Sequence, residues 1–166
     1  MNKTLESTVV PTEIGIETAH RQAVANLLNQ LLADEHVLYI KLRNYHWNVT
    51  GMQFKPLHEL FEEQYNGLAD SIDVLAERIR SLGFFAPTSM AELLQMARLK
   101  ETGHLEGSAT QMVKNLLADN EAISQILRHN IKQADQELND VGTADILTAL
   151  LEDHEKMAWM LRAHLA

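Results

Sequence analysis

Residues 56–83, PLHELFEEQYNGLADSIDVLAERIRSLG, decide the fold. Apolar side chains recur in this stretch at alternating steps of three and four residues: Leu57, Phe61, Tyr65, Leu68, Ile72, Leu75, Ile79 and Leu82. That spacing places them on one stripe of an α-helix. Pro56 suits the first turn of such a helix, and Gly83 suits its C-terminal stop. The stretch therefore predicts one long amphipathic helix.

Three further long helices are expected around this one. The first covers about residues 17–47, and its apolar residues follow the same three-four spacing. Another begins near Ser108 and is broken over residues 139–142, after which Thr143 can cap a last helix that reaches the C-terminus. No alternating strand pattern occurs, so the fold class is all-α.

The connection between the second and third long helices is too long for a hairpin. Ser89 and Glu92 have the spacing of a capping box, which predicts a short helix through about Ala97, and residues 101–107 read as loop. The architecture expected is a four-helix bundle with a short helix in its long crossover.

Composition agrees with a single domain over residues 1–166, with residues 1–16 as a flexible arm. The chain has no Cys, which excludes disulfides and thiolate metal sites. It lacks a secretory signal pattern and any run of apolar residues long enough for a membrane span, so we expect a cytoplasmic protein. Its net charge of −9 favours cations over polyanions as partners, although acidity also simply keeps proteins soluble.

Four polar residues share one stripe of the helix over 56–83: His58, Glu62, Asp73 and Glu77. They form two i,i+4 pairs that face the same way, and His46 ends the preceding helix. The pairs are separated by roughly 16 Å along the helix axis, too far to share one metal ion. Two copies of the helix, antiparallel about a two-fold axis, would bring one pair beside the other and create two identical sites. The spacing therefore predicts a metal site made between subunits.

Three segments closely resemble the signature of the Dps proteins, the miniferritin branch of the ferritin-like superfamily. They are YHWNVTG at 45–51, LHELFE at 57–62 and IDVLAER at 72–78, and the likeness extends to TADIL at 143–147 and to Trp159. The resemblance implies a ferritin-like bundle assembled into a hollow dodecamer. It also implies a ferroxidase that oxidises Fe(II), preferably with hydrogen peroxide rather than dioxygen, and stores the Fe(III) mineral, which protects against oxidative stress.

The same resemblance implies two irons at a centre between subunits, with zinc as a possible substitute. His46 and His58 offer imidazole nitrogen, which suits Fe(II) and zinc alike, while Asp73 and Glu77 offer the hard oxygen that stabilises Fe(III). Glu62 would bind the second iron, directly or through water. Each residue taken alone reads more simply as a structural histidine or a solvated acid, but the combination favours a metal site.

Two other features have a structural and a functional interpretation. Trp47, next to His46, either packs at a helix junction or, as the resemblance implies, traps oxidising equivalents. Glu137, Asp140 and Asp145 lie around the last turn between helices. They are either ordinary surface and first-turn acids that favour the helix dipole or, by the resemblance, the lining of an iron-entry pore at a three-fold axis.

DNA binding is not expected at neutral pH, despite the family resemblance. Residues 1–17 contain one basic residue, Lys3, against three glutamates, and the C-terminus has no basic tail. The alternative function is a nucleoid-binding protein with a minor or structural metal site. A third is a plain helical bundle whose histidines and acids form only salt bridges between subunits.

Overall fold

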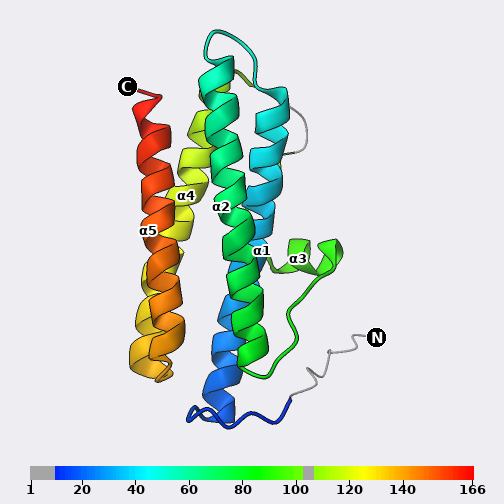
Figure 1. Cartoon of the computed structure of the whole chain (residues 1–166), viewed down its shortest axis with the longest axis vertical. Coiled ribbons are helices and arrows are strands. Elements are labelled where there is room, and N and C mark those ends of the chain that lie inside the picture. The colour runs from blue at the N-terminus through cyan, green and yellow to red at the C-terminus, as the bar shows by residue number, and fades with distance from the viewer. Residues whose placement is uncertain (1–9, 103–106) are drawn as a thin grey trace.

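The computed structural model describes residues 10–102 and 107–166. Its helices are α1 (Thr18–Asn48), α2 (Phe54–Ser81), the short α3 (Met90–Met96), α4 (Ala109–Lys132), the π-helix η1 (Gln133–Glu137) and α5 (Val141–Ala163). No strand occurs within these described residues. The prediction of an all-α four-helix bundle with a short helix in the long crossover is confirmed (Figure 1).

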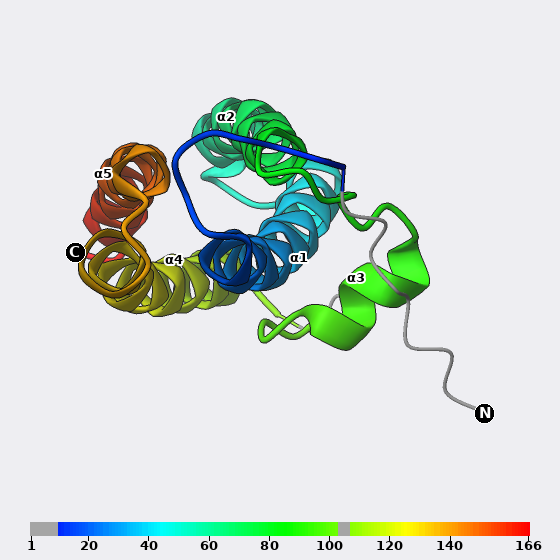
Figure 2. The same ribbon diagram turned by 90° about the horizontal axis from the view of Figure 1, so that it is seen from below.

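The four long helices pack mainly as two pairs, α1 with α2 and α4 with α5. Seen end-on, α1 and α4 lie side by side, while α2 lies beside α1 and α5 beside α4, both on the same side of that pair (Figure 2). The short α3 lies outside the bundle against α1. Leucines dominate the core, and the apolar stripe of α2 faces it as predicted, with Leu57, Phe61, Leu68, Leu75, Ile79 and Leu82 buried.

One polar cluster lies inside this apolar core and ties three helices together. His154 of α5 places Nε2 2.9 Å from Glu35 Oε1 of α1 and Nδ1 2.8 Å from Asn120 Oδ1 of α4. All three side chains are buried, and the Asn120 amide nitrogen donates to the Leu116 carbonyl. Because buried polar groups must be paired, this cluster fixes how α5 is placed against α1 and α4.

The last inter-helix turn differs from the sequence prediction. The structure starts α5 at Val141, and its cap is Asp140, whose carboxylate accepts from the Thr143 N–H at 2.9 Å. Thr143 is therefore not the cap that its sequence position suggested, because an aspartate three residues earlier satisfies the same N–H. The predicted N-cap of the crossover helix is present, since the Ser89 hydroxyl accepts from the Glu92 N–H, while the Glu92 carboxylate accepts from that hydroxyl. The break itself is sharp, with Asn139 at φ 53°.

The arm predicted over residues 1–16 lies partly outside the described residues, as does most of the loop predicted over 101–107. The described part of the arm runs beside the end of α2, where the Val10 N–H donates to the Gly83 carbonyl at 2.9 Å. Gly83 has φ 95°, and a side chain there would meet the Val10 carbonyl oxygen at 2.9 Å. A glycine is therefore needed at this crossing. No described helix is both long enough and apolar enough to span a bilayer.

Candidate metal centre

The end of α1 and the start of α2 are joined by two histidines. His46 Nδ1 lies 2.8 Å from the His58 carbonyl oxygen, and His58 Nδ1 lies 2.8 Å from the His46 carbonyl oxygen. The two rings stack with their centroids 3.7 Å apart. A carbonyl oxygen can only accept, so each Nδ1 carries the proton and donates it to the other residue's backbone.

In the neutral imidazole, this exchange of hydrogen bonds leaves the lone pair on Nε2, which is the form that binds a metal. The ligand atoms of His46, His58 and Glu62 all lie within 4.8 Å of one another. Among the described residues, no other group of three or more histidine and carboxylate side chains has its ligand atoms this close together. Two imidazole nitrogens and a carboxylate oxygen suit Fe(II) or zinc.

The centre opens toward the surface of the single chain. His46 is buried, His58 is half-buried and Glu62 is exposed. Phe54, in the first turn of α2, stacks on the His58 ring with 5.1 Å between centroids. One side of the donor group is thus covered by aromatic rings, while the other side remains accessible to an ion and to further ligands.

Tyr65 is a neighbour of the centre that the sequence analysis did not identify. Its hydroxyl donates to Glu62 Oε1 at 3.3 Å, and its ring meets the His46 ring edge-on at 5.3 Å. Burial of the phenol, and then the charge of the Glu62 carboxylate, raise the pKa of Tyr65 above its ordinary value of 10.0. The phenol therefore stays protonated, as a donor, at neutral pH. Its position three residues after Glu62 was the sequence signal for this contact.

The other two predicted ligands lie elsewhere on the same helix. Asp73 and Glu77 are exposed, and neither belongs to the group formed by His46, His58 and Glu62. Eleven residues separate Glu62 from Asp73, which is roughly 16 Å of helix. Three of the five predicted ligands are thus brought together within one chain, and the remaining two are presented to its surroundings.

Trp47 is not packed in the core of the chain, because 63% of its surface is exposed. Its ring lies 5.0 Å from the guanidinium carbon of Arg43, which also sits 5.0 Å from the Tyr65 ring. Trp47 therefore belongs to an aromatic cluster beside the centre.

The three acidic residues proposed from sequence for a pore have different surroundings. Asp140 is buried and pairs with Arg78 of α2 at 2.6 Å, in addition to capping α5. Glu137 and Asp145 are exposed. Because α5 begins at Val141, Asp145 lies beyond the first turn, which weakens the helix-dipole interpretation of this residue. Within one chain, Asp140 stabilises the fold, whereas the carboxylates of Glu137 and Asp145 are accessible to ions.

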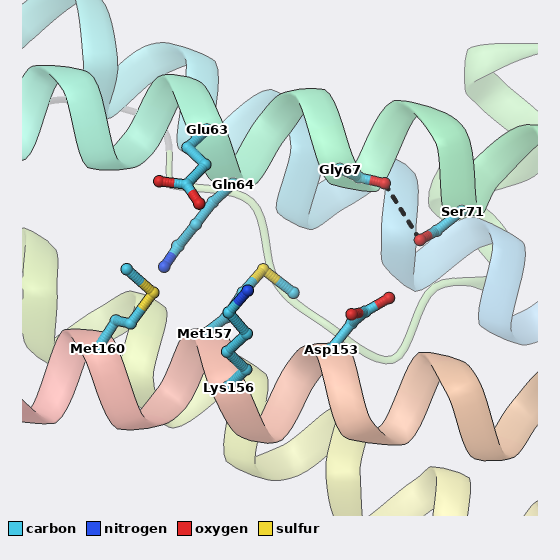
Figure 3. A pocket seen from close by; sticks show the side chains of 8 residues that line it. All are labelled: Glu63, Gln64, Gly67, Ser71, Asp153, Lys156, Met157 and Met160. Carbon is cyan, nitrogen blue, oxygen red and sulfur yellow. Dashed lines mark hydrogen bonds between the residues drawn. The ribbon is translucent and has the colours of Figure 1, made fainter.

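A separate groove of about 220 Å³ runs between α2 and α5. Figure 3 shows Gln64, Met157 and Met160 projecting into it, while the carboxylates of Glu63 and Asp153 lie apart along its length. This arrangement does not bring three ligand groups together, and the groove is therefore distinct from the metal centre.

Comparison with known proteins gives one family match and close relatives. A model of the ferritin-like domain matches residues 25–166. An uncharacterized low temperature-induced protein of Nostoc is 49% identical over 90% of this chain and 84% of its own length. The DNA protection during starvation protein of Brevibacillus brevis is 42% identical over 90% of this chain and 99% of its own. The crystal structure of a Dps protein from Vibrio cholerae is described as a member of a broad superfamily of ferritin-like diiron-carboxylate proteins. It superimposes on this chain with a TM-score of 0.88 at 34% sequence identity. The match covers 96% of this chain and all of that one.

Proposed function

Because the chain belongs to the Dps, or miniferritin, branch of the ferritin-like family, we propose that it is a ferroxidase and iron-storage protein. In this proposal it oxidises Fe(II) and retains the Fe(III) mineral inside a hollow dodecamer in the cytoplasm. Removal of free Fe(II) and of the oxidant together would protect the cell against oxidative stress. Family membership supports the iron-related part of this function.

The observation that carries the proposal is the preformed donor group of His46, His58 and Glu62. A pair of histidines fixed with both Nε2 atoms free is arranged for a metal rather than for packing. The group supplies only three donors and is open on one side. The partner subunit's Asp73 and the partner subunit's Glu77 would complete it across a two-fold axis, giving two centres per dimer.

Fe(II) is the substrate at this centre, and two ions would bind together. The two imidazoles hold Fe(II) by nitrogen, and the carboxylates stabilise the charge of Fe(III) as it forms. With hydrogen peroxide as oxidant, two Fe(II), one peroxide and two protons give two Fe(III) and two waters. Each iron loses one electron, and the O–O bond accepts both. Zinc, which accepts the same ligands, would occupy the centre without reacting.

Entry of iron into the shell would use exposed acids near the last inter-helix turn. Asp145 and Glu137 are accessible for a negatively charged pore at a three-fold axis. Asp140, proposed from sequence for the same role, would act indirectly by holding the turn that presents them.

The test combines assembly, metal position and reaction. Light scattering should give a particle near twelve times the 18.8 kDa chain mass. A crystal soaked in Fe(II) should show anomalous density at the iron edge between His46 and His58 of one subunit and the two acids of its partner. Rapid Fe(II) oxidation should require that assembly. A stable monomer with full activity would refute the shared centre, and iron bound elsewhere would refute the assignment of its ligands.

A further inference from the structure

Tyr65 contacts one candidate ligand on α1 and another on α2. Its hydroxyl donates to Glu62 of α2 at 3.3 Å, and its ring edge rests on His46 of α1 at 5.3 Å with an interplanar angle of 82°. Within the described residues this is the one hydrogen bond recorded for the Glu62 side chain. The orientation of an exposed glutamate and the tilt of a buried imidazole thus depend on the same residue.

Tyr65 is itself held by two residues of α1, Tyr39 and Arg43. Its ring packs edge-on against Tyr39, with 6.0 Å between centroids, and the Arg43 guanidinium lies 5.0 Å from the ring. Arg43 in turn donates to the Tyr39 hydroxyl at 2.8 Å and lies over Trp47. The packing of the Tyr39 ring and of the Arg43 guanidinium on Tyr65 restricts its rotation, so its hydroxyl is presented to Glu62 in a defined direction.

A glutamate with three side-chain torsions loses considerable freedom when it binds a metal. A hydrogen bond that restricts the carboxylate in advance reduces that loss and increases metal affinity. The Tyr65 hydroxyl donates to Oε1 of Glu62, and a carboxylate oxygen has two lone pairs. The second lone pair of Oε1 and both lone pairs of Oε2 are therefore left to bind a metal. A purely packing role would require the ring of Tyr65 but not its hydroxyl.

We infer that Tyr65 is a positioning residue of the metal centre, which orients Glu62 through its hydroxyl and His46 through its ring. The inference rests on the proposed function, because it assumes that these two residues are ligands. It adds a residue outside the predicted ligand set and separates the role of the hydroxyl from that of the ring.

The experiment compares Co(II) binding by the intact assembly of the wild type and three variants. Tyr65→Phe keeps the ring and removes the hydroxyl, Tyr65→Leu removes both contacts, and Tyr39→Phe removes a hydroxyl from the same cluster that contacts neither ligand. Co(II) is measured by calorimetric titration and by its visible absorption, which reports the ligands and their geometry. Circular dichroism and particle size show that each variant is folded and assembled.

Tyr65→Phe should weaken Co(II) binding by about tenfold and alter the visible spectrum, as removal of a partner of a metal ligand generally does. Tyr65→Leu should weaken it further, and Tyr39→Phe should leave affinity and spectrum unchanged. Equal affinity and spectrum in Tyr65→Phe and the wild type, or an equal loss in Tyr39→Phe, would overturn the inference while leaving the proposed function intact. Failure of the wild type to bind Co(II) and to oxidise Fe(II) would instead overturn the proposed function and the inference with it.

Discussion

His46 and His58 each donate a hydrogen bond from Nδ1 to the other's backbone carbonyl, so the contact that joins α1 to α2 also leaves Nε2 of both rings for the proposed metal. Fold stability and site chemistry therefore share the same two hydrogen bonds. Substitution of either histidine would remove a proposed ligand and also release a helix–helix contact.

Replacing both His46 and His58 with Gly should abolish rapid Fe(II) oxidation. It should also lower the free energy of unfolding by about 3 kcal/mol, from two lost hydrogen bonds at about 1 kcal/mol each and a smaller penalty for glycine near helix ends. Oxidation is followed by absorbance and stability by urea denaturation. His36→Gly is the matched control, because the hydrogen bond of its ring goes to the Leu32 carbonyl of its own helix rather than to another helix. Retained oxidation in the double variant would refute the assigned ligands.

A mixture of two inactive variants should regain activity if the centre lies between subunits. The His46→Gly/His58→Gly variant retains Asp73 and Glu77, whereas an Asp73→Ala/Glu77→Ala variant retains both histidines. Each mixed dimer would contain one complete centre, so random pairing should restore about a quarter of the wild-type rate. Native mass spectrometry of the two variants checks the mixing. Demonstrated mixed dimers without activity would indicate a centre within one chain.

Asp140→Ala should destabilise the protein much more than Asp145→Ala. The Asp140 carboxylate caps α5 and pairs with Arg78, and its loss would leave that guanidinium without a carboxylate, bonded to the Thr143 hydroxyl. We expect a decrease in the free energy of unfolding of about 3 kcal/mol. The exposed Asp145 should change stability by less than about 0.5 kcal/mol. Thermal and urea denaturation measure both.

The Asp145→Ala variant, together with a Glu137→Ala variant, also tests the pore. Asp145→Ala should slow the uptake of Fe(II) into the shell without changing the affinity of the metal centre for Co(II). Stopped-flow measurement at limiting Fe(II) separates entry from oxidation. Unchanged uptake in Asp145→Ala and in Glu137→Ala would argue against entry at this turn.

DNA should not be retarded by this protein in a gel at neutral pH and moderate salt. The chain carries a net charge of −9, and an assembly multiplies it. Repulsion from phosphates should dominate within the ~8 Å Debye length of physiological salt. Weak binding below about pH 6 would agree with protonation of histidines. Tight, salt-sensitive retardation at pH 7.5, without bridging divalent ions, would contradict this prediction.

The sequence by itself determined the element types and the face that each helix buries. When large apolar residues recur every three or four positions, the α-helix is the regular structure that places them all on one side. The apolar stripe of α2 accordingly lies in the core. The Ser89 cap of α3 could also be predicted from the sequence, because it depends on residues only three positions apart. Local periodicity and local hydrogen bonds can be read from a linear chain.

Only the tertiary structure decided the contacts between distant residues. Pairing of Asp140 with Arg78, 62 positions away, makes this acid part of the fold, although its sequence surroundings also fit an exposed turn. The mutual orientation of His46 and His58, and the placing of Tyr65 across Glu62 and His46, depend on how α1 and α2 pack. Such contacts follow from the register between helices, which is set by the interlocking of whole side-chain surfaces rather than by any short pattern.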